Sequence, residues 1–119
     1  MTIKPRSVSV WVGDFGSEEA MTRYFEEDFT EDGDAIPSPF QATFHIDYDP
    51  YKFEADIFKG TSDIARALDD ASYSEYYADD VKRSLSIIGE ANTICIIFDC
   101  DPPQKKKDAY LTHILYKRI

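Results

Sequence analysis

The sequence predicts a single α+β domain with a mixed four-stranded sheet packed against helices, in the order β-α-β-(α-α-α)-β-β. Three observations lead to this fold class. A chain of 119 residues suits one domain spanning residues 1–119. Apolar residues make up 43% of it, so the chain can bury a hydrophobic core without disulfides or a structural metal. Segments with the two-residue period of strands are interspersed with segments of helical period.

The first two predicted elements are a strand and a helix. In residues 7–13 valines occupy every second position, so they can face a core while Trp11 covers the other side of the strand. Gly13 allows the chain to turn toward the helix. Ser17 is a suitable N-cap for a helix over residues 17–28, where apolar side chains recur three and four positions apart.

The middle of the chain predicts a loop, a second strand and two short helices. Residues 30–39 are rich in Asp, Gly and Pro, which favour loops. From Phe40 to Tyr48 apolar and polar side chains alternate, a period typical of a strand. The apolar spacing within residues 53–58 suits a short helix, and Ser62 is expected to cap another.

The last third of the chain predicts a helix followed by two strands. Ser74 is a suitable cap for a longer helix that ends at Gly89. The near-continuous apolar run at residues 93–98 predicts a strand buried on both faces. Residues 99–108 predict a polar turn, and residues 109–116 predict a final strand that forms a hairpin with the preceding one.

Cys95 lies within the apolar run of residues 93–98, and Cys100 lies two residues beyond its end. In an extended strand their Cα atoms would be roughly 16 Å apart, whereas a disulfide needs about 4.4–6.8 Å. Both are therefore expected to be free, buried thiols. The first residues lack the apolar stretch of a secretory signal, and no segment reaches the roughly 20 apolar residues of a membrane span. A cytoplasmic location is the resulting expectation.

The net charge is −10 and is unevenly distributed along the chain. Residues 14–80 contain 19 acidic and 4 basic residues, whereas residues 1–13 and 81–119 are each mildly basic. Such a charge repels nucleic acid and anionic membranes and favours a basic partner. The alternative is that the acidity only keeps the protein soluble. The binding face is expected on the first helix, second strand and central helices, not on the terminal strand pair.

Signatures of catalysis are missing from the sequence, which contains no Gly-rich phosphate loop, HExxH, CxxC or GxSxG motif. His45 and His113 lie in predicted strands without a neighbouring nucleophile. Three short acidic pairs could bind a divalent cation, although Asp beside Gly or Pro commonly forms turns. The pairs are Asp32 and Asp34, Asp47 and Asp49, and Asp99 and Asp101. We therefore expect no catalytic residue, no cofactor and no metal.

Tyrosines are interleaved with acidic residues in the centre of the chain. Tyr is enriched in protein interfaces, and complementary charge speeds association. This composition suits a protein that neutralises a basic active-site cleft. Alternatively, the rings pad the core while the carboxylates are solvated, and Tyr77 is expected in the core because it is in phase with Val81 and Leu85. The candidate partner-binding residues are Asp47, Asp49, Asp69, Asp70, Tyr73, Glu75 and Tyr76.

The first 40 residues carry a recognisable pattern. Residues 8–15 read VSVWVGDF, and they are followed by Ser17-Glu-Glu, an aromatic helix, Asp32-Gly-Asp and Ser38-Pro-Phe. In this pattern the sequence resembles the immunity protein 22 family, and the later layout is similar over nearly the whole chain. The resemblance implies a cytoplasmic bacterial protein that binds and inactivates the cognate toxin domain of a polymorphic toxin system.

Three functions stay open at this point. In the first, the protein is an immunity protein that neutralises a toxin domain, such as a nuclease, through an acidic, aromatic-containing surface. In the second, it is a small enzyme that uses paired carboxylates and a divalent ion. In the third, it is a structural subunit of a larger complex. The sequence favours the first, with a basic protein as the partner.

Overall fold

The computed structural model describes residues 4–119. In chain order, the elements are β1 (Ser7–Gly13), α1 (Glu18–Phe25), β2 (Asp28–Phe29), β3 (Ala35–Ile36), α2 (Pro39–Phe44), the 3₁₀ turn η1 (Pro50–Lys52), β4 (Phe53–Ile57), α3 (Thr61–Leu68), the 3₁₀ turn η2 (Ser74–Tyr76), α4 (Ala78–Ile88), β5 (Thr93–Phe98) and β6 (Leu111–Arg118).

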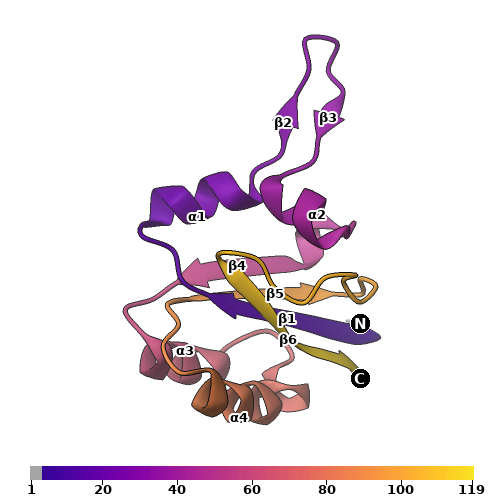
Figure 1. Ribbon diagram of the computed structural model, residues 1–119. Helices are drawn as coiled ribbons and strands as arrows, with labels where there is room; N and C mark the ends of the chain where they lie inside the picture. The colour runs from indigo at the N-terminus through magenta and orange to yellow at the C-terminus, as the bar shows by residue number, and fades with distance from the viewer. Residues whose placement is uncertain (1–3) are drawn as a thin grey trace.

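The four longer strands form one antiparallel sheet with helices on both faces (Figure 1). α1 and α2 cover one face, and α3 and α4 cover the other. The strand order is β4-β5-β1-β6. The predicted α+β class and the four-stranded sheet packed against helices are confirmed, but the sheet is antiparallel throughout and not mixed in strand direction. Within residues 4–119, no helix is both long enough and apolar enough to cross a bilayer.

The last two strands are not neighbours, so the predicted hairpin between residues 93–98 and 109–116 is wrong. β1 lies between β5 and β6 and pairs with both of them. The connection over residues 99–110 is longer than the roughly 2–5 residues of a tight hairpin loop. The chain can therefore pass β1 and pair with its far edge.

β1 is buried on both faces, and its alternating side chains enter two different cores. Val8, Val10 and Val12 are buried with side chains of α3 and α4. Trp11 faces the other side, where its ring meets Phe40 of α2 edge-on, with 5.1 Å between ring centroids. The predicted valine face and tryptophan face are thereby confirmed.

β5 repeats this burial on both faces. All of its residues from Thr93 to Phe98 are buried, as the apolar run predicted. Ile94 and Ile96 join the valines of β1, whereas Cys95 joins Trp11. Cys95 and Cys100 are free and buried, as predicted. Burial raises the pKa of the Cys95 thiol well above its usual value, so this thiol stays protonated and unreactive at neutral pH.

Residues 40–48 do not form the predicted second strand. Ser38 and Gln41 instead form a capping box that starts α2. The Ser38 hydroxyl accepts from the Gln41 N–H at 3.1 Å, and the Gln41 side-chain oxygen accepts from the Ser38 N–H at 2.8 Å. Phe40 and Phe44 are four positions apart, which fits both a strand and a helix, so their spacing alone does not distinguish the two.

The strand that follows is β4, where the sequence predicted a short helix over residues 53–58. β4 pairs antiparallel with β5 from Phe53 to Ile57. Its apolar residues pack toward α1 and α2, and they alternate with the exposed residues Glu54 and Asp56. Pairing with the fully buried strand β5 provides hydrogen-bond partners for backbone groups of β4, and this long-range pairing outweighs the helical spacing of its apolar residues.

α1 starts as predicted and ends early. The Ser17 hydroxyl accepts from the Ala20 N–H at 3.1 Å and caps the helix. The helix ends at Phe25 instead of residue 28, because Glu26 is already extended and leads into β2.

The caps of α3 and α4 differ from the prediction. α3 begins after Gly60, and Ser62 lies inside the helix without capping it. Ser74 opens only the short turn η2, and α4 begins at Ala78. Gly89 ends α4 as predicted.

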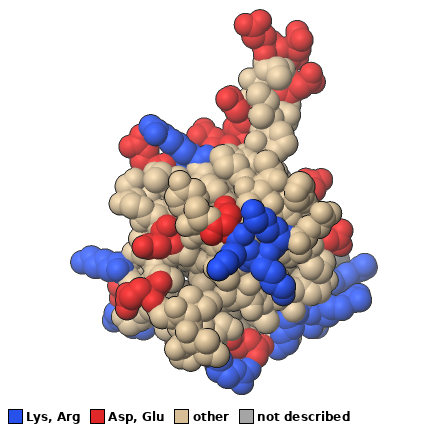
Figure 2. Space-filling model, viewed as in Figure 1, with Lys and Arg blue, Asp and Glu red and all other residues tan. Residues whose placement is uncertain are grey.

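β2 and β3 form a small hairpin, termed the acidic hairpin (residues 26–37), which projects from the body of the protein (Figures 1 and 2). The sequence predicted a loop over residues 30–39, and the short strand β3 lies within that range. Every residue from 26 to 37 is exposed. The side chains of the acidic hairpin are therefore accessible to a partner.

Gly13 is required by a close contact, and its φ is not positive. A Cβ atom at this position would lie 1.9 Å from the carbonyl oxygen of Tyr110 and 2.7 Å from the Leu111 side chain. The same carbonyl accepts from the Asp14 N–H at 3.1 Å, which holds it in place. The glycine thus lets the start of β6 approach the end of β1.

We predict that Gly13→Ala lowers the free energy of unfolding by about 2 kcal/mol or more, because the new methyl group overlaps backbone atoms. Gly16→Ala is the matched control, since a Cβ there has no neighbour within 4 Å. Urea denaturation of both variants measures the difference. Equal stability of the two variants would contradict the close contact.

Candidate functional site

A groove of about 770 Å³ lies at one end of the sheet and is termed the end groove. Of the seven predicted binding residues only Tyr73 lines it, and η1 with the start of β4 reaches it from another part of the chain. Its walls include Arg6, Tyr51, Lys52, Tyr73, Asp99 and Tyr116. The fold therefore does not gather the predicted binding residues in this groove.

The end groove carries charges of both signs. Its lining combines the basic residues Lys4, Arg6 and Lys52 with the acidic residues Glu54, Asp99 and Asp101. The groove is therefore a mixed-charge site, and the acidic excess of the chain lies elsewhere.

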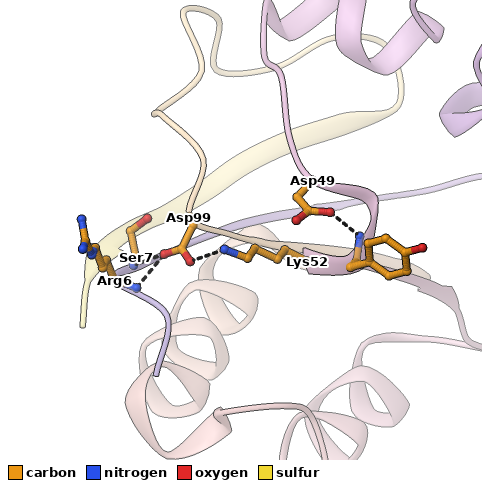
Figure 3. Close-up of polar contacts among 6 residues, drawn as sticks. Arg6, Ser7, Asp49, Lys52 and Asp99 are labelled. Atoms are coloured by element: carbon orange, nitrogen blue, oxygen red, sulfur yellow. Dashed lines mark hydrogen bonds and ion pairs between the residues drawn. The ribbon is translucent and has the colours of Figure 1, made fainter. Parts of the chain in front are cut away.

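Asp99 connects three segments at this groove (Figure 3). One of its carboxylate oxygens accepts from the backbone N–H groups of Arg6 at 2.6 Å and Ser7 at 3.3 Å. The other accepts from the Lys52 ammonium at 2.9 Å. Asp99 has a positive φ of 58°, which turns the chain at the end of β5. The side chain thus ties the start of β1 and η1 to the end of β5.

These contacts keep Asp99 ionised. Burial alone would raise the pKa of its carboxyl group, but the Lys52 ammonium and the Arg6 and Ser7 N–H groups hold that pKa below its usual value. The hydrogen bond to Asp99 in turn raises the pKa of Lys52. The pair is a structural latch in which both groups are already engaged.

Asp49 also has a backbone role. Its carboxylate accepts from the Tyr51 N–H at 2.9 Å and caps η1 (Figure 3). Tyr51 follows with 97% of its surface exposed at the mouth of the end groove. Sequence analysis did not select Tyr51 as a binding residue, although its position directly after Asp49 and Pro50, a turn-forming pair, was visible in the sequence.

The two predicted tyrosines are partly in the core and partly at the surface. Tyr73 lines the end groove and packs edge-on against Phe98, with 5.7 Å between ring centroids. Tyr76 also packs against the core beneath α3 and α4, and Lys4 lies over its ring at 4.9 Å from the centroid. Tyr77 is almost fully buried, as its phase with α4 predicted. The core-packing interpretation therefore holds for Tyr77 and in part for Tyr73 and Tyr76, and the interface interpretation stays a prediction.

The acidic residues of the same segment differ in whether a basic side chain already pairs with them. Asp69 pairs with Lys82 at 2.6 Å, so part of its charge is already compensated. Asp70 and Glu75 are exposed. Their carboxylates can therefore meet a partner directly.

Asp47 lies in a different place from the other candidates. It lines a shallow hollow of about 510 Å³, termed the hairpin-base hollow, between the acidic hairpin and α2. Glu27, Ala35 and His45 share this lining. Asp47 thus lines the hairpin-base hollow and Tyr73 lines the end groove, so the seven predicted residues do not share one pocket.

Sequence analysis missed the acidic hairpin as a candidate site. Figure 2 shows acidic side chains gathered on this projection, while basic side chains lie on the body. The acidic residues of the hairpin are Glu26, Glu27, Asp28, Glu31, Asp32 and Asp34. The sequence contains no Lys or Arg between Arg23 and Lys52, and this gap was the signal that could have identified the hairpin.

The three acidic pairs do not assemble a metal site. Among residues 4–119, no group of three or more His, Cys, Asp or Glu side chains is arranged to hold a metal ion. Asp49, directly before Pro50, accepts a backbone N–H group, which is the turn role expected of Asp beside Pro, and Asp99 also accepts backbone N–H groups.

The histidines have packing and capping positions. His45 is in the left-handed conformation that ends α2, with φ 53°, and not in a strand as predicted. His113 lies in β6, where its ring packs against Trp11 at 4.7 Å between centroids. Burial and the nearby Lys106 lower the pKa of His113 to about 4, so the ring is neutral at pH 7.

The protein is a small α+β domain with an acidic projection and a mixed-charge groove. A family model described as Immunity protein 22 matches residues 8–115 of the 119-residue chain. The chain belongs to the immunity protein 22 family, as its sequence pattern predicted. No curated protein and no solved structure matches the chain.

We predict that Asp99→Asn lowers the free energy of unfolding at pH 7 by about 1 kcal/mol, since the charge that holds Lys52 and two N–H groups is lost. The folded-state pKa of Asp99 is lowered, so its stabilisation is present above the pKa of the unfolded chain and is lost as the pH falls through the folded-state pKa. The two proteins should therefore become equally stable well below about pH 4.

Denaturant titrations between pH 7 and pH 3 test this expectation. Asp101→Asn is the control, because Asp101 is a nearby exposed carboxylate. If the difference between wild type and Asp99→Asn persisted unchanged at pH 3, the latch would not depend on the Asp99 charge.

Proposed function

We propose that this protein binds a cognate toxin domain directly and neutralises it in the cytoplasm. The observation that carries the proposal is the match to the immunity protein 22 family over residues 8–115. An immunity protein protects the producing cell by inactivating a toxin, so the partner is itself a protein.

The charge of the chain supports a basic partner. The net charge is −10, and the excess lies within residues 14–80. A nuclease has a basic cleft because it must bind phosphate, and an acidic surface can occupy such a cleft and exclude the substrate. We therefore propose a nuclease domain as the toxin.

The proposed contact surface contains exposed acidic groups and aromatic rings. Asp70 and Glu75 are exposed near Tyr73, which lines the end groove, and Asp47 lines the hairpin-base hollow. This distribution supports a broad contact area in which the carboxylates steer association and the rings supply apolar contact. The proposed residues are Asp47, Asp49, Asp69, Asp70, Tyr73, Glu75 and Tyr76.

We predict that co-expression of this protein restores growth to cells that produce its cognate toxin domain, for which a domain encoded beside its own gene is the first candidate to test. With the purified pair, raising NaCl from about 50 to 300 mM should slow association by about tenfold and change dissociation less, because salt screens long-range attraction. Stopped-flow mixing at several salt concentrations measures both rates.

The possible outcomes distinguish a failure of the proposed function from a failure of the proposed acidic contact surface. A failure of rescue and binding would contradict the proposed function. Binding with an association rate independent of salt, or an unchanged rate for Asp70→Asn, would contradict the acidic surface while leaving direct neutralisation intact.

A further inference from the structure

The acidic hairpin is a projecting element whose conformation is specified locally. Its strands pair Asp28 with Ile36 and Phe29 with Ala35. A two-stranded hairpin is only marginally stable in water by itself. Its projection from the body therefore requires support from the turn that joins the strands (Figure 1).

The turn supplies that support through a set of short hydrogen bonds. The Thr30 carbonyl accepts from the Gly33 N–H at 2.9 Å, and the Thr30 N–H donates to the Asp34 carbonyl at 2.9 Å. The Thr30 hydroxyl accepts from the Asp34 N–H at 3.0 Å. Gly33 has φ 87°, a conformation that glycine adopts without strain. The hairpin is therefore preorganised before it meets a partner, which lowers the entropy cost of binding.

Two large apolar side chains are exposed on this preorganised element. Phe29 is 63% exposed and Ile36 is 42% exposed. Because Phe29 is paired with Ala35 and Ile36 with Asp28, these two side chains point to opposite faces of the hairpin. A flat partner surface could bury only one of them, whereas a cleft that encloses the hairpin would bury both.

The charge of the hairpin identifies the chemistry of that cleft. Six acidic residues lie between residues 26 and 34, and the sequence has no Lys or Arg from residue 24 to residue 51. Within the described part of the chain, the ion pairs involve none of these six carboxylates. A complementary cleft is basic and has apolar patches on both walls.

The hairpin-base hollow provides room for the rim of such a cleft. It lies where the hairpin leaves the body, and its lining includes Glu27, Pro37 and Asp47. Its acidic groups extend the charge of the hairpin onto the body. A partner that encloses the hairpin would therefore contact the predicted residue Asp47 as well.

We propose that the acidic hairpin inserts into the basic cleft of the toxin domain, with Phe29 and Ile36 buried against its two walls. This inference rests on the proposed function and specifies how the partner is recognised. Mutual repulsion of the acidic tips disfavours a second copy of this chain as the occupant.

The test compares apolar substitutions on and off the hairpin, with the toxin domain that passes the co-expression assay as the probe. We expect Phe29→Ala and Ile36→Ala each to raise the Kd by about 10- to 100-fold. Ile87→Ala is the matched control, since Ile87 is 86% exposed on α4, and it should leave the Kd unchanged. The melting temperature of all three variants should stay close to wild type, because each side chain is exposed.

A second comparison tests the charge of the hairpin. Glu31→Gln combined with Asp32→Asn should slow association by about tenfold in 50 mM NaCl. Glu18→Gln combined with Glu90→Gln removes the same charge elsewhere and should have a smaller effect.

The outcomes separate this inference from the proposed function. If wild type binds the toxin domain and the hairpin variants bind equally well, the hairpin proposal is overturned and the proposed function stands. If wild type does not bind, both are overturned. If the hairpin variants change self-association without changing toxin binding, the hairpin contacts a second copy instead.

Discussion

The fold depends on the burial of β1 and β5 on both faces. These central strands place valine and isoleucine side chains on one face and Trp11, Cys95 and Ile97 on the other, so both faces must be covered. α1 and α2 cover the tryptophan face, and α3 and α4 cover the valine face. The four described α-helices therefore all pack against the sheet. The acidic hairpin is left to project into solvent with its apolar side chains exposed.

Sequence reasoning identified the elements whose period is unambiguous. β1 and β5 were correctly predicted, because the alternation in β1 and the short apolar run in β5 both indicate a strand. Apolar residues spaced four apart, such as Phe40 with Phe44 and Phe53 with Ile57, fit both the helical and the strand period. The segment of α2 was therefore predicted as a strand, and the segment of β4 as a helix. The order β5-β1-β6 depends on long-range pairing, which no local pattern encodes.

The binding surface was less predictable, because composition along the chain does not determine which residues meet in space. Asp47 and Asp69 were grouped by their acidic neighbours, yet one lines the hairpin-base hollow and the other pairs with Lys82. Residues 26–28 of the acidic hairpin were predicted as the end of a helix and residues 30–37 as a loop, since two-residue strands are too short to show a period. Its turn was encoded in Thr30 and Gly33, but their hydrogen bonds became evident only in three dimensions.

A preorganised, acidic projection on a sheet that is covered by helices on both faces would allow recognition without rearrangement of the core. Hydrogen–deuterium exchange of the free protein and of its toxin complex tests this central claim most directly. If the hairpin inserts into the toxin domain, amides of residues 28–36 become protected in the complex, while β1 and β5 are strongly protected in both states. Protection confined to α4 and β6, with exchange in residues 28–36 unchanged, would contradict it.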